Sequence, residues 1–395
     1  MSNLQVSSRI MQAWGATSLV ADFFFRRIVW KQSHADGCDF ASGDPQEMPP
    51  EGFVEAIQKS AIPQNKDWYA YTLGEPAAKE AVVASLEQQF GRPYPVNNIF
   101  LTNGATGALL VTFSALLDAG DEAIFISPPW FFYEGMILNI GATPVRVKID
   151  METYDLDLDA IEAAITEKTR FVLVNSPNNP TGKIYPPETL QKLGEILTKA
   201  SEKYGRTIYL VSDEAYRRIL FDGNSFTTPT SYYPASIMIY TYAKTMLTPG
   251  QRMGYVAVSP DMPNVEQVLS ALMASQAFNG FAIMNAVMQH GLAEFEPLSI
   301  DLEHLQQKRD RLLAGLRQAG YEVATPEATF YLMPRSPIPD DVAFANMLAE
   351  ADLFCLPGTV VEMPGYLRLS ATASSKMIEE GLEILTAVRQ QALAR

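Results

Sequence analysis

Between residues 99 and 258, short hydrophobic stretches alternate with longer stretches in which apolar residues recur at helical spacing. The stretch 169–174 is apolar almost throughout, as in a strand buried on both faces of a parallel sheet. Alternating strands and helices favour an α/β fold with a mostly parallel sheet covered by helices on both faces. The predicted strands are 99–101, 121–126, 142–147, 169–174, 207–211, 237–240 and 256–258, and the predicted helices are 76–90, 108–117, 157–165 and 187–204.

The two ends of the chain show a less regular pattern. We expect one or two amphipathic helices in residues 2–33, a short helix in 51–61 and a long helical region from about 265 to 320. We therefore predict a large domain of residues 49–285 and a smaller α+β domain made of residues 1–48 and 286–395. The short strands expected in the smaller domain are 321–324, 329–333, 354–356 and 366–369.

The composition is that of a globular protein with a sizeable core, because 47% of the residues are hydrophobic and 19% are charged. The net charge of -15 argues against nucleic acid and against an anionic membrane surface as partners. The first residues show no signal-peptide pattern and no apolar run is long enough to span a bilayer, so we expect a cytoplasmic location. No metal site is predicted, since Cys38, Cys355, His34, His290 and His304 show no metal-ligand spacing.

Polar side chains follow several of the predicted strands. Lys244, Asp213 and Asn179 each stand shortly after such a strand, at the edge where parallel sheets bind ligands. A lone lysine in this position is usually a solvated surface residue, so a functional role for Lys244 depends on the other motifs. The turn 102–107 joins a strand to a helix through small residues, which is typical of an anion site formed by backbone N–H groups.

These motifs form an ordered set along the chain. In order they are Asn179-Pro-Thr-Gly182, Asp213-Glu-Ala-Tyr216, Thr241-x-x-Lys244, Arg252 and, near the C-terminus, Arg368-Leu-Ser370. The set resembles the class I and II aminotransferases, the fold-type-I enzymes that depend on pyridoxal 5′-phosphate. The resemblance covers nearly the whole chain, and it implies the cofactor, the fold and the residue roles described next.

The resemblance implies that Lys244 holds the aldehyde of the cofactor as a Schiff base and moves the proton between substrate and cofactor. Asp213 would keep the pyridine nitrogen protonated, because a neighbouring carboxylate raises the proton affinity of that nitrogen. Tyr216 and Asn179 would donate hydrogen bonds to the phenolate oxygen of the ring. The catalytic residues implied are therefore Lys244, Asp213 and Tyr216.

The resemblance also implies which residues bind the phosphate of the cofactor and which residue covers the face of its ring. Arg252 and Thr241 would bind the phosphate together with the helix start at Ala105 and Thr106. Trp130 would stack on the ring of the cofactor.

A tyrosine of the neighbouring subunit reaches the phosphate in this family. Tyr69 lies five residues before Gly74, which is the matching spacing, and Tyr71 is a competing candidate. The resemblance therefore implies a homodimer with shared active sites.

The substrates implied are an amino acid and a 2-oxo acid. Arg368 would bind the α-carboxylate of the amino acid with its planar guanidinium, helped by the Gly43 N–H and the Asn179 amide. The donor side chain is not identified by the sequence. An acidic side chain would need a second arginine in the pocket, whereas a neutral or aromatic one would suit apolar residues such as Trp14, Phe131 and Phe278. The cations without a role are Arg26, Arg27 and Arg146.

Three positions depart from the family pattern. Ala328 stands where glycine is usual, Val361-Glu362 where Phe-Gly is common, and Ala243 where serine is often found. These changes concern the substrate side more than the cofactor core, so they leave the reaction outcome open.

We predict an aminotransferase that moves an amino group between an L-amino acid and a 2-oxo acid in a ping-pong cycle. Lyases for sulfur amino acids or for aminocyclopropane formation, and oxidases that use the same cofactor, are the alternatives. A regulator that senses amino acids with this fold is a third class, disfavoured because the acidic chain leaves no room for a DNA-binding module.

Overall fold

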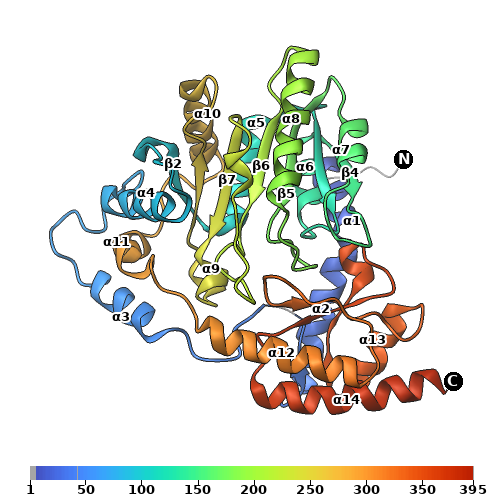
Figure 1. The fold of residues 1–395 in the computed structure, drawn as a ribbon. Coiled ribbons are helices and arrows are strands. Elements are labelled where there is room, and N and C mark those ends of the chain that lie inside the picture. The colour runs from blue at the N-terminus through green and yellow to red at the C-terminus, as the bar shows by residue number, and fades with distance from the viewer. Residues whose placement is uncertain (1–5, 42, 395) are drawn as a thin grey trace.

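The computed structural model describes residues 6–41 and 43–394 and shows a large α/β part above a smaller part (Figure 1). The large part contains a sheet with the strand order β2-β8-β7-β6-β5-β3-β4. Strand β8 runs antiparallel to β7 and β2, and the other neighbouring pairs are parallel, which confirms the predicted mostly parallel sheet. The strands are β2 Ile99–Thr102, β3 Glu122–Ser127, β4 Thr143–Lys148, β5 Thr169–Asn175, β6 Tyr209–Asp213, β7 Ser236–Thr241 and β8 Gly254–Val258.

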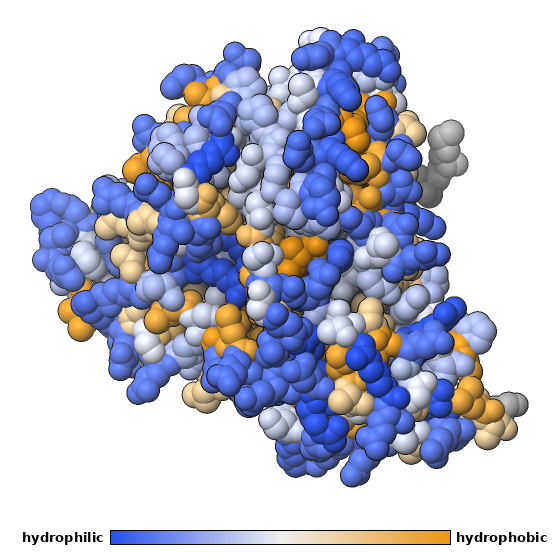
Figure 2. Space-filling model, in the orientation of Figure 1, coloured by the Kyte–Doolittle hydropathy of each residue, from blue (hydrophilic) through white to orange (hydrophobic). Residues whose placement is uncertain are grey.

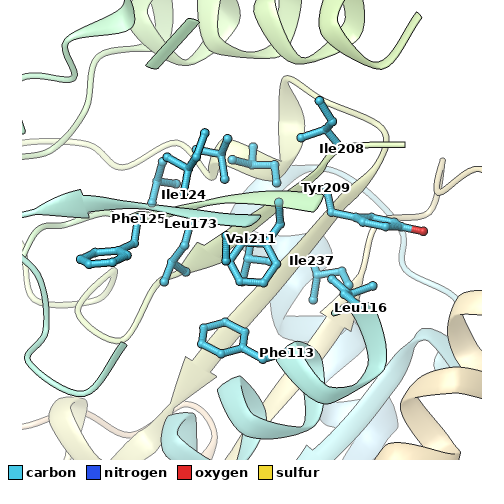
Figure 3. Packing of buried hydrophobic residues seen from close by; sticks show 14 of the residues in the cluster. Phe113, Leu116, Ile124, Phe125, Leu173, Ile208, Tyr209, Val211 and Ile237 are labelled. Carbon is cyan, nitrogen blue, oxygen red and sulfur yellow. The ribbon is translucent and has the colours of Figure 1, made fainter. Parts of the chain in front are cut away.

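Helices cover both faces of this sheet because successive strand residues point to opposite sides. In β7, Ile237 and Ile239 belong to the core that includes helix α5 (Gly104–Leu116). Met238 and Tyr240 of the same strand belong to a second core, which includes helix α4 (Pro76–Phe90). Figure 3 shows Phe113 and Leu116 of α5 lying near Val211 and Ile237 of the sheet.

The long helices begin and end where the sequence indicates. Pro76 and Pro187 occupy the first turn of α4 and of α8, where a missing backbone N–H costs nothing. The remaining helices are α1 Ser8–Ala16, α2 Ser18–Ser33, α3 Glu51–Ser60, α6 Tyr133–Ile140, α7 Leu158–Ala164, α8 Pro187–Tyr204, α9 Tyr242–Thr245, α10 Val265–Phe278, α11 Ala286–Phe295, α12 Leu302–Gln318, α13 Asp341–Glu350 and α14 Ser375–Leu393.

The smaller part contains two short sheets. Strand β12 (Leu367–Ser370) pairs antiparallel with β9 (Tyr331–Leu332) and with β11 (Leu356–Pro357), and β1 (Cys38–Asp39) pairs parallel with β10 (Leu353–Phe354). The strand predicted at 321–324 is wrong, because that segment pairs with no strand. Its apolar first residue, Tyr321, is buried instead against α14, where its hydroxyl donates to the Leu385 carbonyl at 2.9 Å.

The division into residues 49–285 and the two flanking segments stays a prediction. Two helices outside 49–285 pack against the large part, since α1 contacts α6 and α11 contacts α3 and α4. Helix α2 packs instead in the smaller part, where Phe23 and Trp30 contact Phe354.

Among the described residues, no helix is both long and apolar enough to cross a membrane. Figure 2 shows the surface in the orientation of Figure 1 as mostly hydrophilic, with hydrophobic residues in separate areas. One such area lies near the middle of this view, between the large and the smaller part.

Candidate active site

Lys244 lies in a single helical turn, α9, directly after the buried strand β7. The Thr241 hydroxyl starts this turn by accepting a hydrogen bond from the Ala243 backbone N–H at 3.3 Å. The Lys244 Nζ lies 5.8 Å from the centre of the Tyr216 ring and 5.9 Å from the centre of the Phe330 ring. The position of Lys244 just after a strand end is as predicted, and the structure adds that its amine lies near aromatic rings.

Asp213 is the last residue of β6, and its side chain is buried. The Tyr133 hydroxyl donates a hydrogen bond to its Oδ2 at 2.6 Å, and the Ala215 N–H donates to its Oδ1 at 3.2 Å. Burial raises the pKa of Asp213, and the two hydrogen bonds and the charge of Lys244 offset only part of this effect. A cationic partner at this carboxylate would remove the cost of holding its charge in the interior.

Lys244 and Asp213 line one cavity, which lies at the ends of strands from the central sheet. The cavity collects residues from five separate stretches of the chain, so the motifs that are far apart in sequence do meet. Of the predicted cofactor residues, those that line this cavity are Ala105, Thr106, Trp130, Asn179, Asp213, Tyr216, Thr241, Lys244 and Arg252.

One end of the cavity is built for an anion. Ala105 and Thr106 lie in the first turn of α5, whose backbone N–H groups have no partners within the helix. The Arg252 guanidinium donates to the Pro249 carbonyl at 2.7 Å and to the Asn103 carbonyl at 3.3 Å. These two bonds hold the guanidinium beside the helix start.

Gly104 makes this approach possible. A Cβ atom at this position would lie 2.8 Å from Nη2 of Arg252, and the backbone of Gly104 has a φ of +72°. Both conditions exclude an ordinary side chain.

Arg368 lies on β12 and is buried beside the cavity. Its Nη1 donates to the Asn179 side-chain oxygen at 3.0 Å, and its Nη2 donates to the Ala41 carbonyl at 3.0 Å. Its Nε has no hydrogen-bond partner among the described residues. A buried guanidinium with a free N–H is suited to receive a carboxylate.

Gly43 lies close to Phe330 and Tyr331, next to Arg368. A Cβ at Gly43 would lie 2.4 Å from Cε2 of Phe330 and 3.1 Å from the hydroxyl of Tyr331. The glycine therefore lets the backbone of the segment around residue 43 approach the carboxylate-binding side of the cavity.

Two residues of this site were not predicted from the sequence. Tyr331 lies under Arg368, whose Cζ is 4.1 Å from the ring centre, and its hydroxyl accepts from the Tyr216 hydroxyl at 3.5 Å. Burial would raise the pKa of Tyr331, but the charges of Arg368 and Lys244 and the Tyr216 hydrogen bond together lower it. Tyr133, which holds Asp213, is the second. The three-residue spacing from Trp130 to Tyr133, just after a strand, was the only signal that could have found it.

Tyr69 and Tyr71 lie outside this cavity, in the loop between α3 and α4. Tyr69 is 55% exposed and donates a hydrogen bond to the Ala61 carbonyl, and Tyr71 is 92% exposed. Figure 1 shows this loop at the left edge, away from α9. Neither tyrosine serves the cavity of its own chain.

The residues present fit pyridoxal 5′-phosphate. A lysine and a carboxylate share a cavity with an aromatic side chain, Trp130, while an anion site and a buried arginine, Arg368, flank them. An aldehyde, a ring nitrogen, a flat ring and a phosphate are the four features that this donor set would bind.

An α/β fold with such a cavity at its strand ends is typical of enzymes that use a bound cofactor. The chain belongs to the class I and II aminotransferase family, whose model matches residues 35–385. It is therefore a pyridoxal-phosphate-dependent aminotransferase, which moves an amino group between an amino acid and a 2-oxo acid. The lyase and oxidase alternatives find no support in the comparisons.

Relatives match over nearly their whole length. The chain is 31% identical to a probable aspartate/prephenate aminotransferase of Thermus aquaticus over 91% of this chain and 93% of that protein. It is also 31% identical to the aspartate/prephenate aminotransferase of Thermus thermophilus, over 95% and 97% of the two chains.

Solved structures share the fold. An amino transferase of Eubacterium rectale is 28% identical and matches with a TM-score of 0.86 over 98% of this chain and 96% of that one. The Thermus thermophilus aspartate aminotransferase with maleate is also 28% identical, with a TM-score of 0.84 over 98% and 100% of the two chains. These matches confirm the predicted fold class.

Proposed function

We propose that Lys244 holds the aldehyde of pyridoxal 5′-phosphate and that Asp213 binds the ring nitrogen of the same cofactor. The observation that carries this proposal is that both side chains line one cavity, with Arg252 at its anion-binding end and Arg368 beside it. When bound, the cofactor supplies an electron sink for the bonds of the substrate α-carbon.

Each residue of the proposed site then has a role. Lys244 would be released when the donor amino group takes its place, and its amine would then take the proton from the substrate α-carbon and pass it to the cofactor. Asp213 keeps a proton on the ring nitrogen, because its buried carboxylate needs a cationic partner. Tyr216 and Asn179 donate to the ring oxygen, and Trp130 covers the ring face.

Arg368 orients the amino acid. Its free Nε and one Nη bind the α-carboxylate side by side, which sets the α-hydrogen within reach of the Lys244 amine. The donor leaves as a 2-oxo acid, and a second 2-oxo acid receives the amino group in the return half of the cycle.

Replacement of Lys244 tests this assignment. Purified Lys244→Ala with added cofactor should lack the visible absorbance band of the wild type and should lose turnover by several orders of magnitude. Lys168→Ala, which changes an exposed lysine, should keep both. A normal band and normal turnover in Lys244→Ala would refute the role of this lysine.

We further propose a cytoplasmic homodimer in which each subunit completes the phosphate site of the other with Tyr69. The support is that Tyr69 and Tyr71 are exposed, lie outside their own cavity and stand in a loop that also exposes Leu73. An apolar side chain beside two exposed aromatic ones favours a protein–protein contact.

Hybrid dimers test the sharing of sites. Coexpressed Lys244→Ala and Tyr69→Phe subunits should form hybrids with one intact site, so their activity should exceed the mean of the two parent variants. The same experiment with Tyr71→Phe decides between the two tyrosines. Activity equal to the parental mean with both variants would refute a shared site.

A further inference from the structure

We propose that the site takes an amino donor with a neutral, apolar side chain in preference to aspartate or glutamate. This inference rests on the proposed function, since it assumes that Arg368 binds the α-carboxylate. Two features support it, namely the contacts that hold the remaining arginines and the apolar side chains near Trp130.

A dicarboxylic donor needs two cations, because burying its second carboxylate without a partner is costly. The cavity-lining residues include two cations, Lys244 and Arg252, and Arg368 lies beside them. The proposed function uses all three, for the aldehyde, the phosphate and the α-carboxylate. Within one chain, the candidates for a further cation are the arginines without a role, Arg26, Arg27 and Arg146, and in the proposed homodimer the partner subunit is another source.

Each of these arginines is held by other groups. The Arg27 guanidinium lies 2.7 Å from an oxygen of Asp39 and 2.7 Å from an oxygen of Asp44. Asp39 is almost fully buried, so removal of Arg27 would leave a buried charge without its main partner. Arg26, on the same helix, donates to the side chain of Asn346. Neither is available without breaking these contacts.

Arg146 is held between two glutamates. Its Nε lies 2.9 Å from a carboxylate oxygen of Glu362, and its Nη2 lies 2.6 Å from Oε2 of Glu134. Glu362 also accepts a hydrogen bond from the Ser127 hydroxyl at 2.7 Å, at the end of the strand that leads to Trp130. The side chain that contacts this strand end is thus the carboxylate of Glu362, which would repel a second substrate carboxylate.

In contrast to the carboxylates around Arg146, the side chains next to Trp130 are apolar. A chain of aromatic contacts leads away from Trp130, with ring centres 6.0 Å apart to Phe131, 5.6 Å from there to Phe24 and 5.4 Å from there to Phe23. Phe23 belongs to a buried cluster that includes Ala41, whose carbonyl binds Arg368. These contacts connect the proposed cofactor-stacking residue to a buried apolar cluster, which includes the residue whose backbone carbonyl binds Arg368.

Val361 lies in this same cluster, where an aromatic residue is common in the family. Phe24 and Phe131 pack against this cluster, so the side chains around Val361 are apolar. On the other side, Thr106 also lines a hollow with Ile10, Trp14 and Phe132. The apolar side chains near Trp130 and this mostly apolar hollow both favour a donor with an aliphatic or aromatic side chain over a charged one.

The first test measures binding of unreactive acids to the enzyme loaded with cofactor. Calorimetric titration with 3-phenylpropionate and 4-methylpentanoate should show binding at least about tenfold tighter than titration with maleate or succinate. Tighter binding of the two dicarboxylates would overturn the inference, and would show that a cation from elsewhere, such as a second subunit, completes the pocket.

The second test follows single half-reactions by the absorbance of the bound cofactor. Leucine, methionine and phenylalanine should convert it at least about tenfold faster than aspartate or glutamate at equal subsaturating concentrations. The opposite order would overturn the substrate class and leave the proposed function standing. If none of these amino acids converted the cofactor, the proposed function itself would be refuted together with the inference.

A matched pair of variants locates the pocket. Phe24→Arg places a cation beside Phe131, so it should strengthen maleate binding and weaken 3-phenylpropionate binding, each by about tenfold. Phe25→Arg places the same cation on the same helix at a residue that is 66% exposed, and should change neither. Equal effects of the two variants would contradict the location of the pocket.

Discussion

At the scale of single residues, the proposed binding of the cofactor ring requires the buried carboxylate of Asp213 to stay charged. Asp213 has one phenolic and one backbone hydrogen bond, and burial still raises its pKa. The positions of Lys244 and Asp213 were predictable, because polar side chains that bind ligands follow the ends of parallel strands. Tyr133 and Tyr331 were not, because an aromatic residue in an apolar stretch looks the same whether it packs in a core or binds a polar group.

Tyr133 tunes the carboxylate that faces the ring nitrogen. Tyr133→Phe removes the hydrogen bond to Oδ2 of Asp213, so the carboxylate should hold its charge less well and cofactor affinity should fall by about tenfold. Equilibrium titration of the apoenzyme with cofactor measures this. Tyr233→Phe removes another buried hydroxyl bond, to the Ile208 carbonyl, and should lower stability without changing cofactor affinity. Unchanged affinity in Tyr133→Phe would count against this role.

Asp213 also makes the stability of the apoenzyme depend on pH. A carboxyl group whose pKa is raised by folding favours its protonated form, so its unfavourable contribution is absent below the unfolded pKa of about 3.9 and grows as pH rises through the folded pKa. The free energy of unfolding of apo Asp213→Asn, minus that of the wild type, should therefore increase as pH rises. Urea titrations between about pH 4 and 8 measure the difference, which should rise above the unfolded pKa and level off above the folded one; a difference that is flat over this whole range, or that falls, would contradict it.

At the scale of elements, the connections between strands build the site. The hydrophobic pattern predicted the strands of the large sheet well, because buried parallel strands are short and apolar throughout. It did not reveal that β8 runs antiparallel, since a strand direction leaves no mark on composition. It also misplaced a strand at 321–324, because Tyr321 is buried there without a partner strand.

The turn before α5 gives an element-scale prediction. Gly104→Ala should weaken cofactor binding, because the added Cβ would displace the Arg252 guanidinium from the helix start. It should also destabilise the protein by about 1 kcal/mol through its left-handed backbone. Gly120→Ala is the matched control, because its φ is +90° with no atom within 4 Å of the added Cβ. That variant should show the loss of stability alone, and equal cofactor affinities in the two variants would contradict the role of Gly104.

At the scale of the whole molecule, the site joins the large sheet to the smaller part. Arg368 comes from β12 of the smaller part and meets Asn179 from the end of β5. Arg368 and Asn179 are 189 residues apart in the sequence. Only the family resemblance indicated that they belong to one site. A single sequence gives little information about subunit contacts, because an exposed apolar residue does not show which surface it contacts.

Glu362 links the two parts and carries strain. It binds Ser127 and Arg146 of the large part, and its backbone has a φ of +61°, in the left-handed region. Glu362→Gly and Glu362→Ala both lose the contacts, but only glycine relieves the backbone. Glu362→Ala should therefore be less stable than Glu362→Gly by roughly 1 kcal/mol in urea unfolding. An alanine variant as stable as the glycine variant would contradict this account.

The central claim is that Lys244 is the residue on which the cofactor is held. Borohydride reduction of the loaded enzyme fixes the cofactor to its lysine, and mass spectrometry of the proteolytic peptides then locates the modified residue. The account predicts the added mass on Lys244. The added mass on another lysine of the chain, or on none, would contradict it.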